Sequence, residues 1–155
     1  MAATGERVDP FRSYNFLVEI DGITQAGFKE CRGLDAFQDI VEYREGKDRS
    51  LSLRKLPGLS RHPNIILMRG ITIDLALWKW REEVINGKIN RKTCTISLCD
   101  DTGPAGTKMS WNFSEAWPVK WVGPYFDATS SEVAIEALEI THEGMTILPA
   151  AAAEG

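Results

Sequence analysis

The sequence predicts a mainly β protein with one helix packed on the outside of a sheet or barrel. Several segments alternate apolar and polar residues, which is the two-residue period of a half-buried strand. Only one segment, 75–86, repeats its apolar residues at helical spacing. A single amphipathic helix in a strand-rich chain usually covers a sheet from outside.

The composition describes one ordinary globular domain, 1–155. Hydrophobic residues make up 43% of the chain and charged residues 26%. The net charge of −4 gives no electrostatic reason to expect specific nucleic-acid binding. No apolar run reaches the roughly 20 residues of a transmembrane span. The N-terminus has no apolar signal region, so we expect folding in the cytoplasm without an N-terminal signal peptide.

The first half of the chain is predicted to be strands joined by short turns. Asp21-Gly22 favours a hairpin, because both turn positions need positive φ. We expect Leu56-Pro57-Gly58-Leu59 to interrupt strand pairing, since proline lacks an N–H. The expected elements are an N-terminal arm at 1–10, a strand at 14–20, a return strand at 23–30, a strand at 38–44, a strand at 50–54 that pairs back across Gly46, and a central strand at 65–68.

The helix at 75–86 has a predicted start, stop and buried face. Asp74 can cap its first turn, and Gly87 suits a left-handed stop. The buried face is expected to hold Leu77, Trp78, Val84 and Ile85.

The second half is predicted to be strands at 91–100, 108–114 and 132–142, with a loop at 100–106 and a flexible tail at 148–155. The second of these strands continues through 116–121 past Pro118, which suggests an edge or a bulge. The apolar alternation of 132–142 changes phase. We interpret this segment as a strand with a bulge near Ala137 rather than as a helix.

No residue pattern supports catalysis, a cofactor or a metal site. His62 and His142 have no second ligand or base at motif spacing. Cys94 and Cys99 lie five residues apart on one strand, which places them on opposite faces. The three cysteines are expected to be buried free thiols. The five tryptophans could stack on bases, but in an acidic chain they are better explained by core and interface packing.

The segment 42–70 carries an apolar row within a charged stretch. Its leucines, Leu51, Leu53, Leu56 and Leu59, follow neither a helical stripe nor a clean core strand. An exposed apolar row usually needs a partner surface. The sequence therefore predicts a protein whose role is assembly, with 42–60 as an extended arm between subunits.

Several blocks occur in a specific order along the chain. They are Asp9-Pro10-Phe11, Asn15–Gly22, Gly27–Cys31, Gly33-Leu34, Glu42–Gly46, Arg54–Leu59, Asn64-Ile65, Arg69–Thr72, Leu77–Trp80, Ala116-Trp117-Pro118, Lys120-Trp121, Gly123-Pro124, Glu132–Glu136 and His142-Glu143-Gly144. From about Asp9 to Met145, this arrangement resembles the tail tube protein family of contractile phage tails and extracellular contractile injection systems.

The resemblance implies a tail-tube (Hcp-like) architecture, in which the protomer is a two-sheet β-barrel or sandwich with a flanking helix. It implies homohexameric rings stacked into a rigid hollow inner tube, which sheath contraction drives through a target envelope. Sheath, baseplate and tube-terminator proteins would be partners, and protein or DNA would be the cargo of the lumen. After folding in the bacterial cytoplasm, the protein would join a phage tail or an extracellular or cell-associated particle.

On this interpretation the arm contacts neighbouring subunits. Its leucines would pack against them, while Arg44, Lys55 and Arg69, with Glu45, would set the register by charge pairing. The arm and the loop at 100–106 are expected to contribute to ring stacking. The predicted self-assembly interface consists of Glu42, Tyr43, Arg44, Glu45, Leu51, Leu53, Lys55, Leu56, Pro57, Leu59 and Arg69.

Three alternatives stay open. The chain could be a ring-forming tube protein of a type VI secretion system, although the blocks at 42–46 and 55–59 favour the phage-like branch. It could be a baseplate-proximal tube initiator that forms one ring. It could also be a small β-barrel enzyme or ligand-binding module with a tryptophan-lined pocket.

Overall fold

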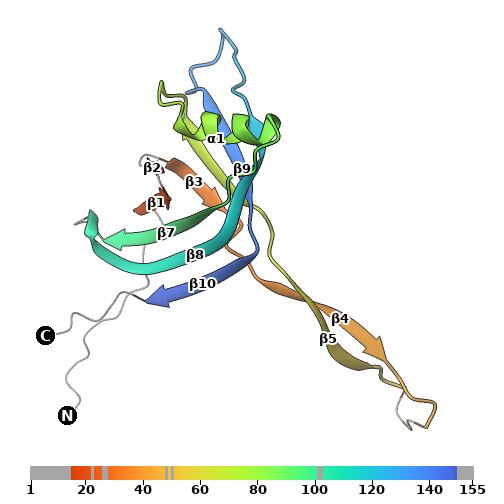
Figure 1. Ribbon diagram of the computed structural model, residues 1–155. Helices are drawn as coiled ribbons and strands as arrows, with labels where there is room; N and C mark the ends of the chain where they lie inside the picture. Colours follow the sequence, from red (N-terminus) through yellow and green to blue (C-terminus); the bar gives the residue numbers. More distant parts are fainter. Residues whose placement is uncertain are drawn as a thin grey trace, which may run out of the picture.

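The computed structural model describes residues 15–21, 23–25, 28–47, 49, 51–100 and 103–149. The predicted N-terminal arm at 1–10 lies outside these residues. The described elements, shown in Figure 1, are β1 (Phe16–Ile20), β2 (Ile23–Gln25), β3 (Phe28–Arg32), β4 (Phe37–Tyr43), β5 (Arg54–Arg61), β6 (Ile65–Gly70), α1 (Ala76–Ile85), β7 (Lys92–Asp100), β8 (Gly103–Val122), β9 (Ile135–Thr141) and β10 (Gly144–Pro149). The mainly β prediction with one helix is confirmed.

The long strand β8 pairs with three other strands of the body. Its first part pairs with β7 and β10, and its last part pairs with β9. The body strands run in the order β2-β1-β7-β8-β9-β6-β3. Because β8 pairs with β7 and β10 in one sheet and with β9 in the other, it belongs to both. Where it passes from one sheet to the other, Glu115 adopts a φ of 53°, a left-handed conformation that is uncommon outside glycine. The two sheets enclose the core, and α1 lies across one end of them (Figure 1).

The core is built from the inward residues of both sheets and from α1. Its fully buried side chains include Val18, Ile65, Leu67, Leu77, Trp80, Cys94, Ile96, Phe113, Leu138 and Ile140. Trp80 donates from Nε1 to the Asn90 carbonyl at 2.8 Å, which satisfies its polar atom. Burial raises the pKa of the Cys31 and Cys94 thiols to about 12. All three cysteines are free, but only Cys94 and Cys99 are buried as expected, and Cys31 is partly exposed.

The helix prediction is correct in position but wrong in part of its buried face. Asp74 Oδ1 accepts a hydrogen bond from the Ala76 N–H at 3.0 Å, so it does satisfy a donor of the first turn. Leu77 and Trp80, three residues apart, are the buried pair. Ile85, the last residue of α1, is exposed, and Trp78 and Val84 are only partly buried, with Trp78 packed against Trp121.

Several strand predictions in the first half need correction. The expected return strand at 23–30 is two strands, because β2 pairs with β1 whereas β3 pairs with β6. The expected strand at 50–54 is absent from the described residues, and β5 begins only at Arg54. Pro57 does not end the pairing but lies inside β5 opposite Ile40. Each strand of a two-stranded ribbon has an unpaired edge, so proline's missing N–H is tolerated there.

The second half also differs from the sequence prediction. The loop at 100–106 is much shorter, because Asp100 already pairs with Gly103. Pro118 lies in the part of β8 that pairs only with β9, so it is at a sheet edge as expected, and the predicted bulge is present between Pro118 and Lys120. The strand β9 is confirmed, yet it pairs with β6 without a bulge at Ala137. The strand β10 was not predicted, and it includes Leu148 and Pro149 of the predicted tail.

Candidate assembly surface

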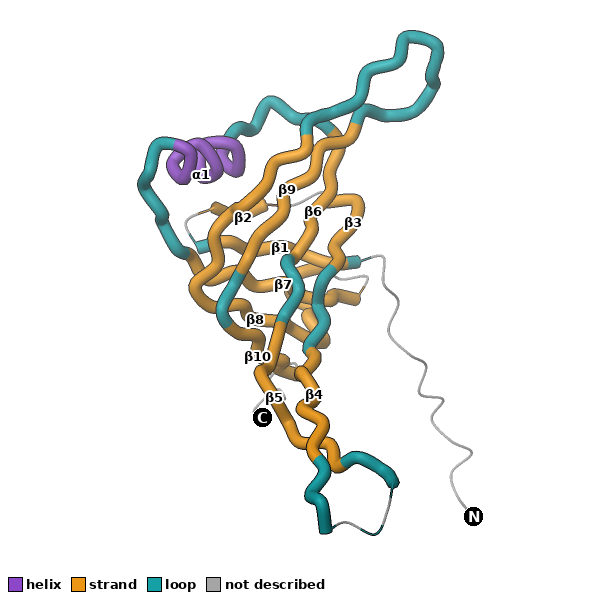
Figure 2. Tube along the Cα trace, turned by 90° about the vertical axis from the view of Figure 1, so that its right-hand side faces the viewer, coloured by secondary structure: helices purple, strands orange, loops and turns teal. Residues whose placement is uncertain are grey.

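The ribbon of β4 and β5, together with the described residues between them, 44–47, 49 and 51–53, is here called the arm. Figure 2 shows it projecting from one end of the body. With seven residues, β4 extends about 23 Å at roughly 3.3 Å per residue. The pairing brings Glu42 opposite Lys55 and Val41 opposite Leu56.

The arm exposes apolar side chains on both of its faces. Ile40 and Val41 are consecutive in β4, so they point to opposite faces, and both are exposed. The other large exposed apolar residues are Phe37, Tyr43, Leu51, Leu53, Leu56 and Leu59. An isolated two-stranded hairpin is at best marginally stable in water. The arm therefore exposes apolar surface that a partner could cover, and such a contact would stabilise the ribbon.

Local contacts hold the arm in its extended form. Arg61 Nε and Asp39 Oδ2 form an ion pair of 2.7 Å across the ribbon. Gln38 Nε2 donates to the Gly58 carbonyl at 3.0 Å. A Cβ atom at Gly58 would lie 2.9 Å from the Asp39 carbonyl oxygen, so glycine permits the strands to approach closely there. At the root, His62 Nδ1 lies 3.3 Å from the Asp35 carbonyl oxygen.

The structure places almost all of the predicted interface residues on the arm. Glu42, Tyr43, Arg44, Glu45, Leu51, Leu53, Lys55, Leu56, Pro57 and Leu59 all lie there and are exposed. Phe37, Ile40 and Val41 are also exposed on the arm but were not among the predicted interface residues. The feature of the sequence that could have indicated them is the presence of apolar residues at consecutive positions of a strand, next to a charged hairpin.

Arg69 does not belong to this surface, which corrects the sequence prediction. It lies near the end of β6 with only 5% of its surface exposed. Its Nε donates to Glu136 Oε1 at 2.8 Å, and its Nη2 donates to the Asp74 carbonyl at 3.1 Å. Its charge is therefore paired within the protomer.

The opposite end of the body carries a second exposed apolar surface. It is formed by two loops, 71–75 and 123–134, here called the apical loops. The Ile71 N–H donates to the Ala134 carbonyl at 3.2 Å and ties the two loops together. A cavity of about 380 Å³ opens here, lined by Tyr125, Phe126, Asp127, Ser130, Glu132, Val133, Ala134 and Ile135.

Chemistry-bearing side chains are sparse in the described part of the chain. No group of three or more His, Cys, Asp or Glu side chains in the described ranges could hold a metal ion. His62 and His142 lie with their ring centroids 5.3 Å apart where the arm meets the body. Among the described residues, no helix is long and apolar enough to span a membrane.

The two-sheet body, its flanking helix and the exposed arm define a β-rich protein with large exposed apolar side chains at both ends. Residues 12–146 match the family described as T4-like virus tail tube protein gp19. The chain belongs to this tail tube family. No curated protein shows significant sequence similarity to it.

Solved structures of contractile injection systems are similar to this chain over nearly its whole length. A chain of the PVC sheath–tube complex in the extended state is 31% identical over 90% of this chain and 92% of that one, with a TM-score of 0.80. A chain of the anti-feeding prophage tube terminating cap is 32% identical over 97% of this chain and 100% of that one, also with a TM-score of 0.80. These similarities confirm the family resemblance seen in the sequence.

Hcp1 from Flavobacterium johnsoniae shares the fold. It is 18% identical over 86% of this chain and 94% of that one, with a TM-score of 0.50. The Hcp-like architecture expected from the sequence is therefore confirmed at the level of fold.

Proposed function

We propose that this protein assembles into homohexameric rings that stack as the hollow inner tube of a contractile tail or injection system, without catalytic activity. The observation that carries the proposal is the arm, whose apolar side chains are exposed on both faces of a two-stranded ribbon. A second subunit that covers this ribbon would bury apolar area and complete its pairing.

The body also offers open strand edges for lateral contacts. Among the described strands, β2 and β3 end the strand order, and β10 pairs only with β8. Pairing edges between neighbours in a closed ring removes them as sites of uncontrolled aggregation. Stacking then needs a second, head-to-tail contact, which continues from ring to ring. Tube-sheath, baseplate and terminator contacts and passage of DNA or protein through the lumen follow from this role.

The proposal is tested by electron microscopy of the purified protein at rising concentration. We expect hollow tubes of uniform diameter from the wild type. Lys55→Glu reverses a charge that faces Glu42 across the arm, and we expect rings or monomers but no tubes. Lys79→Glu, the same charge change on the exposed side of α1, is the matched control and should form tubes. Wild-type-length tubes from Lys55→Glu would contradict the role of the arm in stacking.

A second candidate is a single-ring component at one end of a tube. The similarity to a chain of the anti-feeding prophage tube terminating cap favours it. Such a protein would give single rings at every concentration. The same microscopy therefore separates the two roles.

A further inference from the structure

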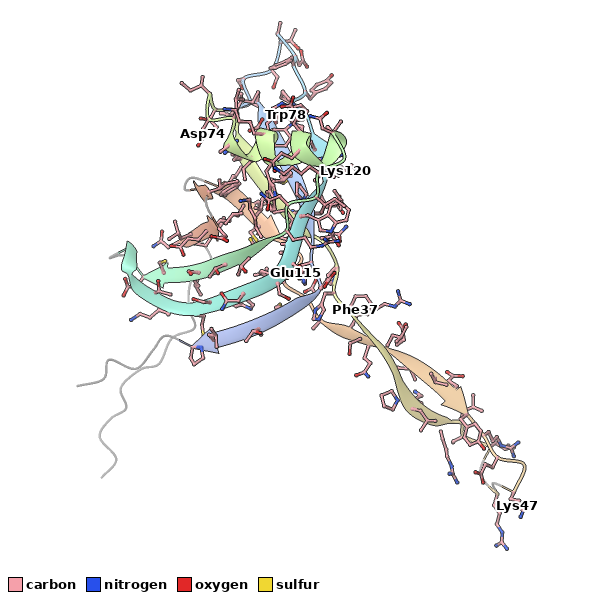
Figure 3. The ribbon with its side chains drawn as sticks, in the orientation of Figure 1. Phe37, Lys47, Asp74, Trp78, Glu115 and Lys120 are labelled. Atoms are coloured by element: carbon pink, nitrogen blue, oxygen red, sulfur yellow. The ribbon has the colours of Figure 1, made fainter. Side chains whose placement is uncertain are left out.

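The two histidines of the chain meet where the arm joins the body. His62 follows β5, the second strand of the arm, and His142 lies between β9 and β10 of the body. Their ring centroids are 5.3 Å apart, with an angle of 44° between the ring planes. Figure 3 shows Phe37 and Glu115 at the same junction. Histidine is the side chain whose ordinary titration range lies between pH 5 and 8, so this pair is suited to respond to pH.

The ring of His142 is enclosed and uncharged at neutral pH. It packs edge to face against Phe113 of β8, with 4.7 Å between the ring centroids. Both of its ring nitrogens are covered, and neither makes a hydrogen bond of good geometry to the described residues. Burial, and secondly the charge of His62, lower the pKa of His142, although the backbone of Gly144 and Pro63 acts in the opposite direction. A proton on this ring is therefore unfavourable in the folded protein.

The charged side chains around the pair do not compensate a proton on His142. The surrounding segments carry Asp35, Arg61, Glu115, Glu139 and Glu143. Arg61 is already paired with Asp39 at 2.7 Å, and Asp35 contributes its backbone carbonyl, 3.3 Å from His62 Nδ1. Among the charged groups of the described residues, His62 is the one that shifts the pKa of His142. Two protonated rings at this separation would repel each other.

The junction combines one fixed contact with room for movement. Gly33 has a φ of 99°, and a Cβ atom there would clash with the Asn64 carbonyl oxygen, so the segments entering and leaving the arm pass in close contact. On the arm side, His62 lines a cavity of about 320 Å³ together with Ala36, Phe37, Gln38 and Ser60. The His62 ring can therefore move away from His142 without displacing the core.

We propose that the pair of His62 and His142 makes the orientation of the arm relative to the body sensitive to pH. At neutral pH the two rings pack together and fix the root of the arm. When both are protonated, repulsion moves His62 into the adjoining cavity, and the arm samples more orientations. The change takes place within one copy, so it can be tested whether or not copies form tubes. Only its effect on assembly rests on the proposed function.

Distances between two spin labels, one on the arm and one on the body, give a direct test. The label sites are Glu42→Cys in β4 and Lys79→Cys on α1, both at exposed positions. Cys94 and Cys99 are buried, and burial raises the pKa of the Cys31 thiol to about 12, so the native thiols react slowly with a thiol-directed label. Labelled protein is diluted into unlabelled wild type, so that only distances within one copy are recorded by pulsed electron spin resonance.

We expect the distribution of label distances to be at least twofold wider at pH 5.5 than at pH 7.5. The variants His62→Gln and His142→Gln each remove one of the two charges, so their distributions should stay equally narrow at both pH values. The matched control is Lys120→Gln, which removes an exposed positive charge at the level of α1 (Figure 3) and should respond to pH as the wild type does. A narrow distribution at pH 7.5 also shows that each variant is folded.

The same distribution at both pH values in the wild type would overturn this inference. Broadening in both histidine variants that equals that of the wild type would also overturn it, because other groups would then be responsible. Electron microscopy that shows no tubes from the wild type would contradict the proposed function and leave this inference unaffected.

Discussion

The body and the arm use similar residues for opposite purposes. In β6, Ile65 and Leu67 are fully buried in the hydrophobic core. In the arm, Ile40 and Leu56 occupy strands of comparable length and remain exposed. A strand in the body has covered faces, whereas a two-stranded ribbon has nothing to cover it. Apolar residues in the body therefore stabilise the protomer, and those in the arm are available to stabilise contacts between protomers.

The same contrast holds for ion pairs. Arg69 and Glu136 are buried in the body at 2.8 Å, while Arg61 and Asp39 are exposed on the arm at 2.7 Å. The two N–O distances are nearly equal, but the exposure of the two ion pairs to solvent differs. Water screens the exposed pair, whereas a buried charge that loses its partner stays desolvated.

The largest effect on the protomer should follow from breaking the buried pair. Arg69→Met leaves the Glu136 carboxylate buried without its partner, and we expect a loss of about 3–5 kcal/mol in the free energy of unfolding. Arg61→Met on the arm should lose less than about 1 kcal/mol. Urea unfolding of dilute protein measures both. Combining Arg69→Met with Glu136→Leu should recover part of the loss, and no recovery would contradict this account.

A matched pair of leucines sharpens the comparison. Leu67→Ala removes a side chain that is 1% exposed, so we expect a loss of about 2–5 kcal/mol from transfer and cavity terms. Leu51→Ala, at the tip of the arm, should change the free energy of unfolding by less than about 0.5 kcal/mol. It should instead reduce polymer formation in a sedimentation assay. Equal destabilisation by the two changes would contradict the division between body and arm.

The smallest effect concerns pH at the junction between the two regions. Burial, and secondly the neighbouring His62, lower the pKa of His142, while backbone contacts with Gly144 and Pro63 oppose this. In the unfolded chain, His142 therefore binds a proton as the pH falls through about 6.5. In the folded protein, it binds that proton only at a lower pH. Stability should fall as the pH drops through 6.5 and level off below the pKa of the folded state.

Unfolding titrations between pH 7.5 and 5.5 measure this slope. His142→Gln should reduce it, because glutamine does not titrate in this range. An unchanged slope in that variant would assign the pH dependence to other groups.

The sequence was most informative where the signal is local. The alternation in β1 and β7, the apolar run of β6 and the period of α1 all predicted their elements. Pairing between distant segments was not predictable in the same way. Whether Pro57 ends a strand depends on whether its nitrogen faces the partner strand or the open edge of the ribbon. The separation of β2 from β3 depends on their pairing with two different strands.

The same distinction between local and long-range signals applies to the residues of the candidate site. The leucines of the arm could be recognised because charges surround them in sequence. Arg69 was misassigned because its partner, Glu136, is 67 residues away. The apical surface was not predicted, because the fold brings together loops 71–75 and 123–134. Neither loop alone has a sequence pattern that indicates a site.

The position of β8 in the chain also sets an order of events during synthesis. This strand pairs with β7, which precedes it, and with β9 and β10, which follow it. Until the last strands have formed, β8 presents an unpaired edge to other nascent chains, which is a route to misassembly. Loss of the segment 144–149 would leave that edge open permanently. Both edges of β8 are therefore covered only after the C-terminal strands β9 and β10 have formed.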